Sequence, residues 1–120
     1  MTLPNDLDLA GCCSATYSHP AARWLLGESY HPGGLALTSR LVDLAGIGIG
    51  DRVLDAGCGR GASSVHLAKS FGCHVVGVTL ETDLVEAARA QARERGVEQR
   101  TTFIQGDLYH TSLEPSSFDA

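Results

Sequence analysis

The stretch "VLDAGCGRG" at residues 53–61 holds the residues best suited to chemistry. An apolar run ends in the acid Asp55 and then breaks into glycines at every second position. Alternate glycines after a strand-like run indicate that something approaches the main chain closely, because glycine has no side chain to hold it off. The glycines are Gly57, Gly59 and Gly61.

Three kinds of neighbour fit this loop. Gly57, Gly59 and Ala62 match the dinucleotide fingerprint G-x-G-x-x-G/A, in which a pyrophosphate sits on a helix N-terminus. Asp55 would repel a pyrophosphate but suits S-adenosylmethionine, which carries an ammonium and a sulfonium. The carboxylate of S-adenosylmethionine would accept hydrogen bonds from the N–H groups of the glycines. Asp55 would accept a hydrogen bond from the ammonium, directly or through water, or would hold the loop in shape. The third neighbour is the following helix alone.

Two further stretches end in groups that suit an adenosine. About twenty residues past the glycines, "VVGVTLE" ends in Thr79, Leu80 and Glu81, where a ribose diol is gripped in either ligand class. "FIQGD" ends in Asp107, a carboxylate that can accept a hydrogen bond from an adenine amino group. Leu80 and Leu108 would sandwich the ring. Ligands of open parallel sheets bind at the carboxyl ends of the strands, where all these groups would meet.

The elements that must position these groups alternate from Asp51 onward. Strands are predicted in "RVLDAG", "CHVVGVTL" and "TTFIQGD", and helices in "GASSVHLAKSFG" and "TDLVEAARAQARERG". Thr82 or Asp83 is the expected cap of the second helix, with Leu84, Ala88 and Ala92 on one face. The alternation predicts an α/β fold, a right-handed doubly wound parallel sheet with helices on both faces.

Upstream of the sheet, a helix is predicted from Gly34 to Ala45, since Leu37, Leu41 and Leu44 follow a three-to-four spacing. "HPAARWLLGES" predicts a shorter helix before it. We therefore divide the chain into an N-terminal arm with a short helix, 1–32, and a cofactor-binding domain, 33–120. "SSFDA" resembles the start of a fourth strand, so we expect this domain to be incomplete at Ala120.

Four of these stretches, in their order and spacing, resemble the first four motifs of class I S-adenosylmethionine-dependent methyltransferases. They are "VLDAGCGRG", "VVGVTLE", "FIQGD" and "SSFDA". "HPGGLALTSRL" is similar to the helix that precedes the motifs in small-molecule methyltransferases. The resemblance implies a Rossmann-like three-layer fold and methyl transfer from S-adenosylmethionine to a small-molecule acceptor. The implied cofactor-binding residues are Gly33, Gly34, Asp55, Ala56, Gly57, Cys58, Gly59, Gly61, Thr79, Leu80, Glu81, Gly106, Asp107 and Leu108.

The position of Thr79 departs from the family, which usually has an acid there to chelate both ribose hydroxyls. Three alternatives stay open. Cys12 and Cys13, with Cys58 and Cys73, allow an arsenite methyltransferase-like enzyme that binds As(III) through thiols. The glycine loop allows an NAD-dependent oxidoreductase. A truncated chain allows a cofactor-binding fragment without turnover.

Charge, composition and residue spacing limit the kinds of partner and metal that we expect for this chain. The formal net charge is −5 over 120 residues, and no segment carries a basic stripe, so nucleic acid is not the expected partner. No stretch is long and apolar enough to cross a membrane. Neither the cysteines nor the histidines have metal-ligand spacing, so no metal is expected. Unpaired thiols are typical of a reducing cytoplasm, the expected location.

Overall fold

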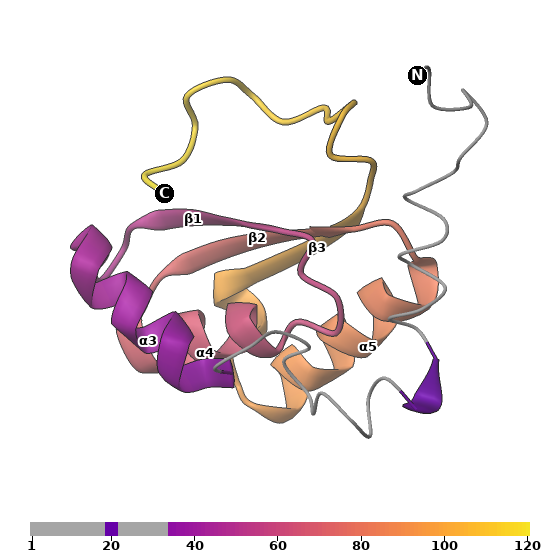
Figure 1. Ribbon diagram of the computed structural model, residues 1–120, viewed down its shortest axis with the longest axis horizontal. Helices are drawn as coiled ribbons and strands as arrows, with labels where there is room; N and C mark the ends of the chain where they lie inside the picture. The colour runs from indigo at the N-terminus through magenta and orange to yellow at the C-terminus, as the bar shows by residue number, and fades with distance from the viewer. Residues whose placement is uncertain (1–18, 22–33) are drawn as a thin grey trace, which may run out of the picture.

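The computed structural model describes residues 19–21 and 34–120. From residue 34 on, helices alternate with strands (Figure 1). In chain order the elements are α3 (Gly34–Ala45), β1 (Arg52–Ala56), α4 (Ala62–Phe71), β2 (His74–Thr79), α5 (Thr82–Glu94), the 3₁₀ turn η1 (Glu98–Arg100) and β3 (Thr101–Gln105). The predicted strands and helices are confirmed to within one or two residues at most of their ends. The arm at 1–32 lies almost wholly outside the described residues, as does most of "HPAARWLLGES".

The three strands form one parallel sheet in the order β1-β2-β3. Ala56 pairs with Val78, and Thr79 with Gln105, so the carboxyl ends of all three strands meet at one edge. Figure 1 shows α3, α4 and α5 on the same side of the sheet. The described part of the chain therefore has the parallel sheet of a Rossmann-like fold and one of its helical layers.

The helix ends follow local chemistry, with one correction. Gly72 ends α4 in the left-handed conformation, at φ 71°, as its position predicted. The N-cap of α5 is Glu81, not Thr82 or Asp83. The Glu81 carbonyl accepts the first bonds of the helix, from the N–H groups of Leu84 and Val85 at 3.2 Å each. An extended backbone at Glu81 starts the helix without a side-chain cap, so the capping preference of threonine and aspartate did not decide the boundary.

The core lies between the sheet and the helices. Its members are buried apolar side chains from both layers: Val42, Val53, Val65, Leu67, Ala68, Cys73, Val75, Val85, Ala88, Ala92, Val97 and Phe103. The leucine row of α3 is not among them. Leu37, Leu41 and Leu44 are exposed, and α3 turns Thr38 and Val42 inward instead. The spacing thus predicted the helix, but did not identify the buried face.

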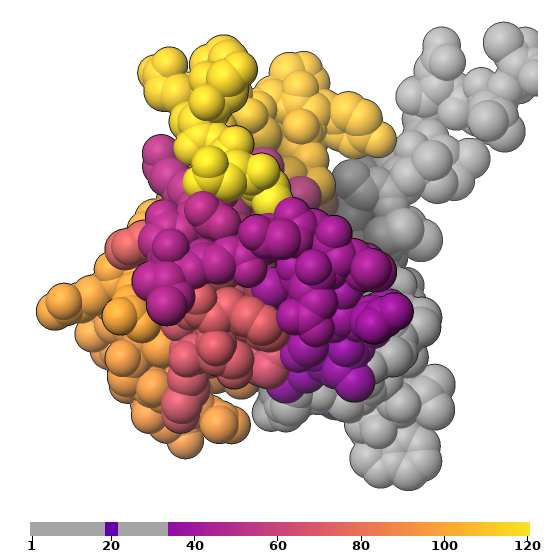
Figure 2. All heavy atoms as spheres, turned by 90° about the vertical axis from the view of Figure 1, so that its left-hand side faces the viewer, coloured from indigo at the N-terminus to yellow at the C-terminus, as the bar shows by residue number. Residues whose placement is uncertain are grey.

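The C-terminal residues run alongside β1, on the side away from β2. The Leu54 N–H donates to the Ala120 carbonyl at 2.9 Å, and the N–H groups of Asp119 and Ala120 point to the Arg52 carbonyl at 2.7 and 3.4 Å. This is the bonding pattern of a parallel strand pair, in which one residue bonds to both neighbours of its partner. Figure 2 shows these yellow residues seated against the magenta residues of β1. Residues 116–120 are not assigned as a strand, so the fourth strand that "SSFDA" predicts is seen only as this pairing of its last two residues with β1.

Candidate functional site: the carboxyl ends of the three strands

The glycine loop, residues 57–61, connects β1 to α4 and folds over the end of β2. The N–H groups of Gly57 and Cys58 both donate to the Val78 carbonyl, at 2.8 and 2.9 Å. Gly57, Gly59 and Gly61 have φ of 75°, 54° and 83°. L-residues with side chains seldom adopt these values, so the turn itself requires glycine.

Gly57 and Gly61 differ in what surrounds them. A Cβ on Gly61 would lie 2.8 Å from the Ala88 Cβ and 3.1 Å from the Phe103 ring. A Cβ on Gly57 would meet nothing within 4 Å. Gly61 is therefore needed for packing of the loop against α5 and β3, whereas Gly57 leaves bare main chain facing open space. Helix–strand packing explains one of these glycines and leaves the approach to Gly57 available to a ligand.

Asp55, at the end of β1, is tied to the first turn of α4. Its Oδ2 accepts a hydrogen bond of 2.6 Å from the hydroxyl of Ser64, which is completely buried. The bond spans the glycine loop from end to end. This geometry agrees with the interpretation in which Asp55 holds the loop in shape. Ser64 is not among the residues predicted from the sequence. The only sequence feature that indicates it is a serine in the first helical turn after the glycine loop.

Cys58 is a packing residue of the loop. Its Sγ covers Gly77 of β2, where an added Cβ would lie 2.8 Å from the sulfur. Burial, with a smaller contribution from the Asp55 charge, raises the pKa of the Cys58 thiol to about 12. A neutral thiol is a poor ligand for a thiophilic ion, since the thiolate is the form that binds. Cys12 and Cys13 lie outside the described residues.

The end of β2 and the turn that follows it present one buried and two exposed residues. Thr79 is buried, whereas Leu80 and Glu81 are exposed. The amide of Gln105 at the end of β3 donates to the Leu80 carbonyl at 3.0 Å, and this bond links the turn to the neighbouring strand end. The Leu80 side chain therefore stands on an anchored main chain at the sheet edge.

Asp107 lies in the exposed turn after β3. The Gly106 N–H donates to the Thr79 carbonyl at 2.9 Å, which joins this turn to the end of β2. The Asp107 carboxylate accepts the Tyr109 N–H at 2.9 Å and faces the His110 Nδ1 at 3.3 Å. These two hydrogen bonds hold the pKa of Asp107 below its usual value, with the Tyr109 N–H as the larger cause. Asp107 is thus an anionic acceptor at the rim, beside half-exposed Leu108.

The predicted set therefore converges, with one part undescribed. The strand ends bring together the glycine loop, the turn after β2 and the turn after β3. Gly34 begins α3, whose Thr38 hydroxyl lies 3.4 Å from the Ser63 hydroxyl of α4, close to the glycine loop. Gly33 lies outside the described residues. Asp55, Glu81 and Asp107 thus lie at or just after the ends of three adjacent strands, and negative charge at this edge suits a ligand with a cationic group.

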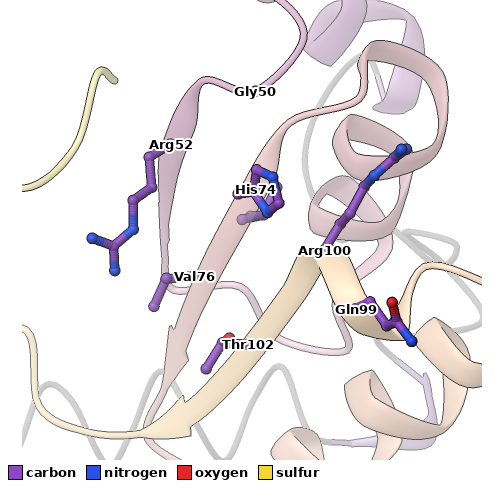
Figure 3. Close-up of a pocket in the computed structure, with 8 residues that line it drawn as sticks. Gly50, Arg52, His74, Val76, Gln99, Arg100 and Thr102 are labelled. Atoms are coloured by element: carbon purple, nitrogen blue, oxygen red, sulfur yellow. The ribbon is translucent and has the colours of Figure 1, made fainter.

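A groove of about 220 Å³ lies elsewhere, around the amino ends of the strands (Figure 3). Arg52 and His74 begin β1 and β2, and Arg100 precedes β3; Figure 3 shows these side chains diverging rather than pointing at a common centre. None of the predicted cofactor-binding residues lines this groove. We do not regard it as part of the candidate site.

Within residues 19–21 and 34–120, no three His, Cys, Asp or Glu side chains gather to hold a metal ion. No helix described by the structure is long and apolar enough to traverse a bilayer.

The chain belongs to the methyltransferase domain family, whose sequence pattern it matches over residues 53–120. The geranyl diphosphate 2-C-methyltransferase of Saccharopolyspora erythraea is 44% identical over 77 residues, which are 64% of this chain and 27% of that protein.

Two solved structures share the fold. A geranyl diphosphate methyltransferase in complex with S-adenosylmethionine is 38% identical, with a TM-score of 0.61 over 67% of this chain and 33% of the other. An RNA methyltransferase from Salinibacter ruber in complex with S-adenosylhomocysteine is 33% identical, with a TM-score of 0.64 over 68% and 53%. This chain spans about a quarter to a third of the curated relatives. These relatives give no support to the arsenite or nicotinamide alternatives.

Proposed function

We propose that this chain is the cofactor-binding part of an S-adenosylmethionine-dependent methyltransferase that acts on a small molecule in the cytoplasm. One observation carries the proposal: three adjacent strand ends bring bare glycine main chain and three carboxylates to one edge of the sheet. A cationic ligand with an adenosine end has a partner there for each of its parts.

Different groups of residues would bind different parts of the cofactor. The glycine loop would hold its amino-acid end, with main-chain N–H groups for the carboxylate and the charge of Asp55 near the ammonium. Gly33 and Gly34 would border the same end. Thr79, the Leu80 main chain and Glu81 would hold the ribose. Leu80 and Leu108 would enclose the adenine, with its amino group on Asp107.

The cofactor, when bound, supplies a methyl group on a sulfonium, which is already electrophilic. The residues of this chain would bind and orient it so that the methyl group faces the acceptor, and positioning of this kind supplies much of the rate in transfer reactions. Asp55 and Asp107 would act as anchors at opposite ends of the cofactor. Neither is assigned a proton-transfer role.

Isothermal titration calorimetry of the full chain with S-adenosylhomocysteine, and separately with NAD, tests the cofactor. We expect binding of S-adenosylhomocysteine and none of NAD. Binding of NAD alone would overturn the proposal in favour of an oxidoreductase. Binding of neither ligand would contradict the proposal that this chain binds S-adenosylmethionine.

The similarity to two geranyl diphosphate methyltransferases favours a narrower candidate, methylation of a carbon atom in an isoprenoid diphosphate. Incubation of the whole methyltransferase that contains this chain with methyl-labelled cofactor and geranyl diphosphate should then transfer label to the isoprenoid. A parallel incubation with RNA serves as the comparison, because one structural neighbour is an RNA methyltransferase. Label in RNA and none in geranyl diphosphate would exclude geranyl diphosphate as the acceptor.

A further inference from the structure

Ser64 is the only completely buried hydroxyl among the residues that the structure describes. It lies in the first turn of α4, and its Oγ donates to the Asp55 Oδ2 at 2.6 Å. Ser64 follows Asp55 by nine positions in the chain, and the glycine loop lies between them. The bond therefore closes the loop at its base and joins the end of β1 to the start of α4.

The chemistry of the pair makes this bond more than ordinary packing. A hydrogen bond from a hydroxyl to an ionised carboxylate is shorter and stronger than one between neutral groups. A half-buried carboxylate that loses such a donor loses part of what compensates its desolvation. Ser64 thus restrains the direction in which the Asp55 carboxylate faces, because Asp55 cannot turn without breaking the bond.

The loop depends on the same contact. Gly57 and Cys58 are held on their β2 side by the Val78 carbonyl, and Gly61 is held on its α5 side by close packing. The Ser64–Asp55 bond adds the third restraint, at the base of the loop. Together the three contacts restrict movement of the main chain around Gly57 and Gly59.

We propose that Ser64 is a positioning residue for cofactor binding: it orients Asp55 and preforms the glycine loop without touching the cofactor itself. This inference rests on the proposed function, because the ligand in question is S-adenosylmethionine. Binding to a preformed loop costs no free energy for ordering it. Affinity for the cofactor should therefore fall when the Ser64–Asp55 bond is removed.

The test is a double-mutant cycle on the full chain, with Ser64→Ala, Asp55→Asn and the two combined. Affinity for S-adenosylhomocysteine is measured by calorimetry well below the midpoint of thermal unfolding. Removal of a hydrogen bond to a charged group should weaken binding by about tenfold in Ser64→Ala. Asp55→Asn should weaken it by at least as much, and the double variant should be no weaker than Asp55→Asn alone.

Ser70→Ala is the matched control, because Ser70 lies on the same helix and also bonds a side chain, the His66 Nδ1 at 3.3 Å. Its affinity should equal that of the unmodified chain. Ser64→Cys, close to serine in volume but a weaker donor, keeps the test valid if Ser64→Ala unfolds. Its affinity should fall between those of the unmodified chain and Ser64→Ala.

The outcomes separate the two claims. If the unmodified chain binds and Ser64→Ala binds equally well, or if the effects of Ser64→Ala and Asp55→Asn simply add, the positioning role is overturned and the proposed function stands. If the unmodified chain does not bind S-adenosylhomocysteine, the proposed function itself falls, and the role of Ser64 with it. Without ligand, faster amide hydrogen exchange at Gly57 and Gly59 in Ser64→Ala than in Ser70→Ala supports preformation, and equal exchange contradicts it.

Discussion

The loop after β1 and the turn after β3 place their acids at the same sheet edge by different means. Residues 57–61 are held by hydrogen bonds to the Val78 carbonyl, by the packing of Gly61 against α5 and β3, and by the part-buried Ser64–Asp55 bond. Asp107 is held in the open by its own turn, through Tyr109 and His110. Packing gives the first region one shape that depends on distant elements. Local hydrogen bonds shape the second with little help from the core.

The comparison predicts that the loop is far less tolerant of change than the turn. Under the proposed function, the loop would hold the charged amino-acid end of the cofactor, whose carboxylate needs N–H groups in fixed directions. The exposed turn would lie at the rim of the adenine pocket, where one acceptor and an apolar contact are enough.

The largest effect is expected when a side chain is added inside the packed loop. Both Gly61→Ala and Gly57→Ala force a residue with a Cβ into positive φ, at a cost of about 1–2 kcal/mol. Gly61→Ala also brings its Cβ against the Ala88 Cβ, and such overpacking typically costs another 1–3 kcal/mol, roughly. Urea unfolding followed by circular dichroism should show a larger loss of unfolding free energy for Gly61→Ala. Equal losses would mean that the loop is not packed as described.

Gly59→Val should abolish binding of S-adenosylhomocysteine, because a branched side chain at φ 54° would distort the loop and fill the space that the ligand needs. Calorimetry at a temperature where the variant stays folded measures this. Gly50→Val is the matched control: Gly50 also has a positive φ, 81°, but precedes β1 at the opposite end of the sheet. Retained affinity in Gly59→Val, or equal loss in the control, would refute a specific role for the loop.

The next prediction concerns the thiol in the packed loop. With a pKa near 12 instead of 9.0, Cys58 should react with iodoacetamide at pH 8 on the order of a thousandfold more slowly than in the unfolded chain. The neutral form is favoured by folding, so this contribution to stability is complete below pH 9 and is lost as pH rises towards 12. Asp55→Asn should speed alkylation modestly, because burial remains the larger cause. Mass spectrometry follows the modification, and rapid labelling of the folded chain would contradict the packing.

The smallest effect is expected at the exposed turn. The Asp107 carboxyl should titrate below 3.8 in a carbon-detected NMR titration. His110→Ala should move it only part of the way back, since the Tyr109 N–H is the larger cause and remains. The stabilisation from this group is present above the ordinary pKa and is lost as pH falls through the lowered one. A midpoint at or above 3.8 would show that the Tyr109 N–H and His110 do not stabilise the Asp107 carboxylate.

Much of the fold was predictable from the sequence because its elements have strong local signals. The valine-rich run at β2 and the glycine that ends α4 are examples. The convergence of Asp55, Thr79 and Asp107 also followed from the order of the motifs, because parallel strands all end at one edge. The start of α5 did not follow, since an extended backbone at Glu81, and not a capping side chain, decided it.

What the sequence by itself determined is therefore the order of strands and helices, and the edge at which the acids and glycines gather. The periodicity of side chains and the glycines that end helices are local properties, so they can be read from the sequence without knowing the tertiary contacts. Only the tertiary structure decided that Gly61 packs while Gly57 stays open, that Ser64 holds Asp55, and that α3 buries Thr38 in place of its leucines. Each of these depends on which atoms lie within a few ångströms across elements distant in sequence, and no spacing along one chain specifies that.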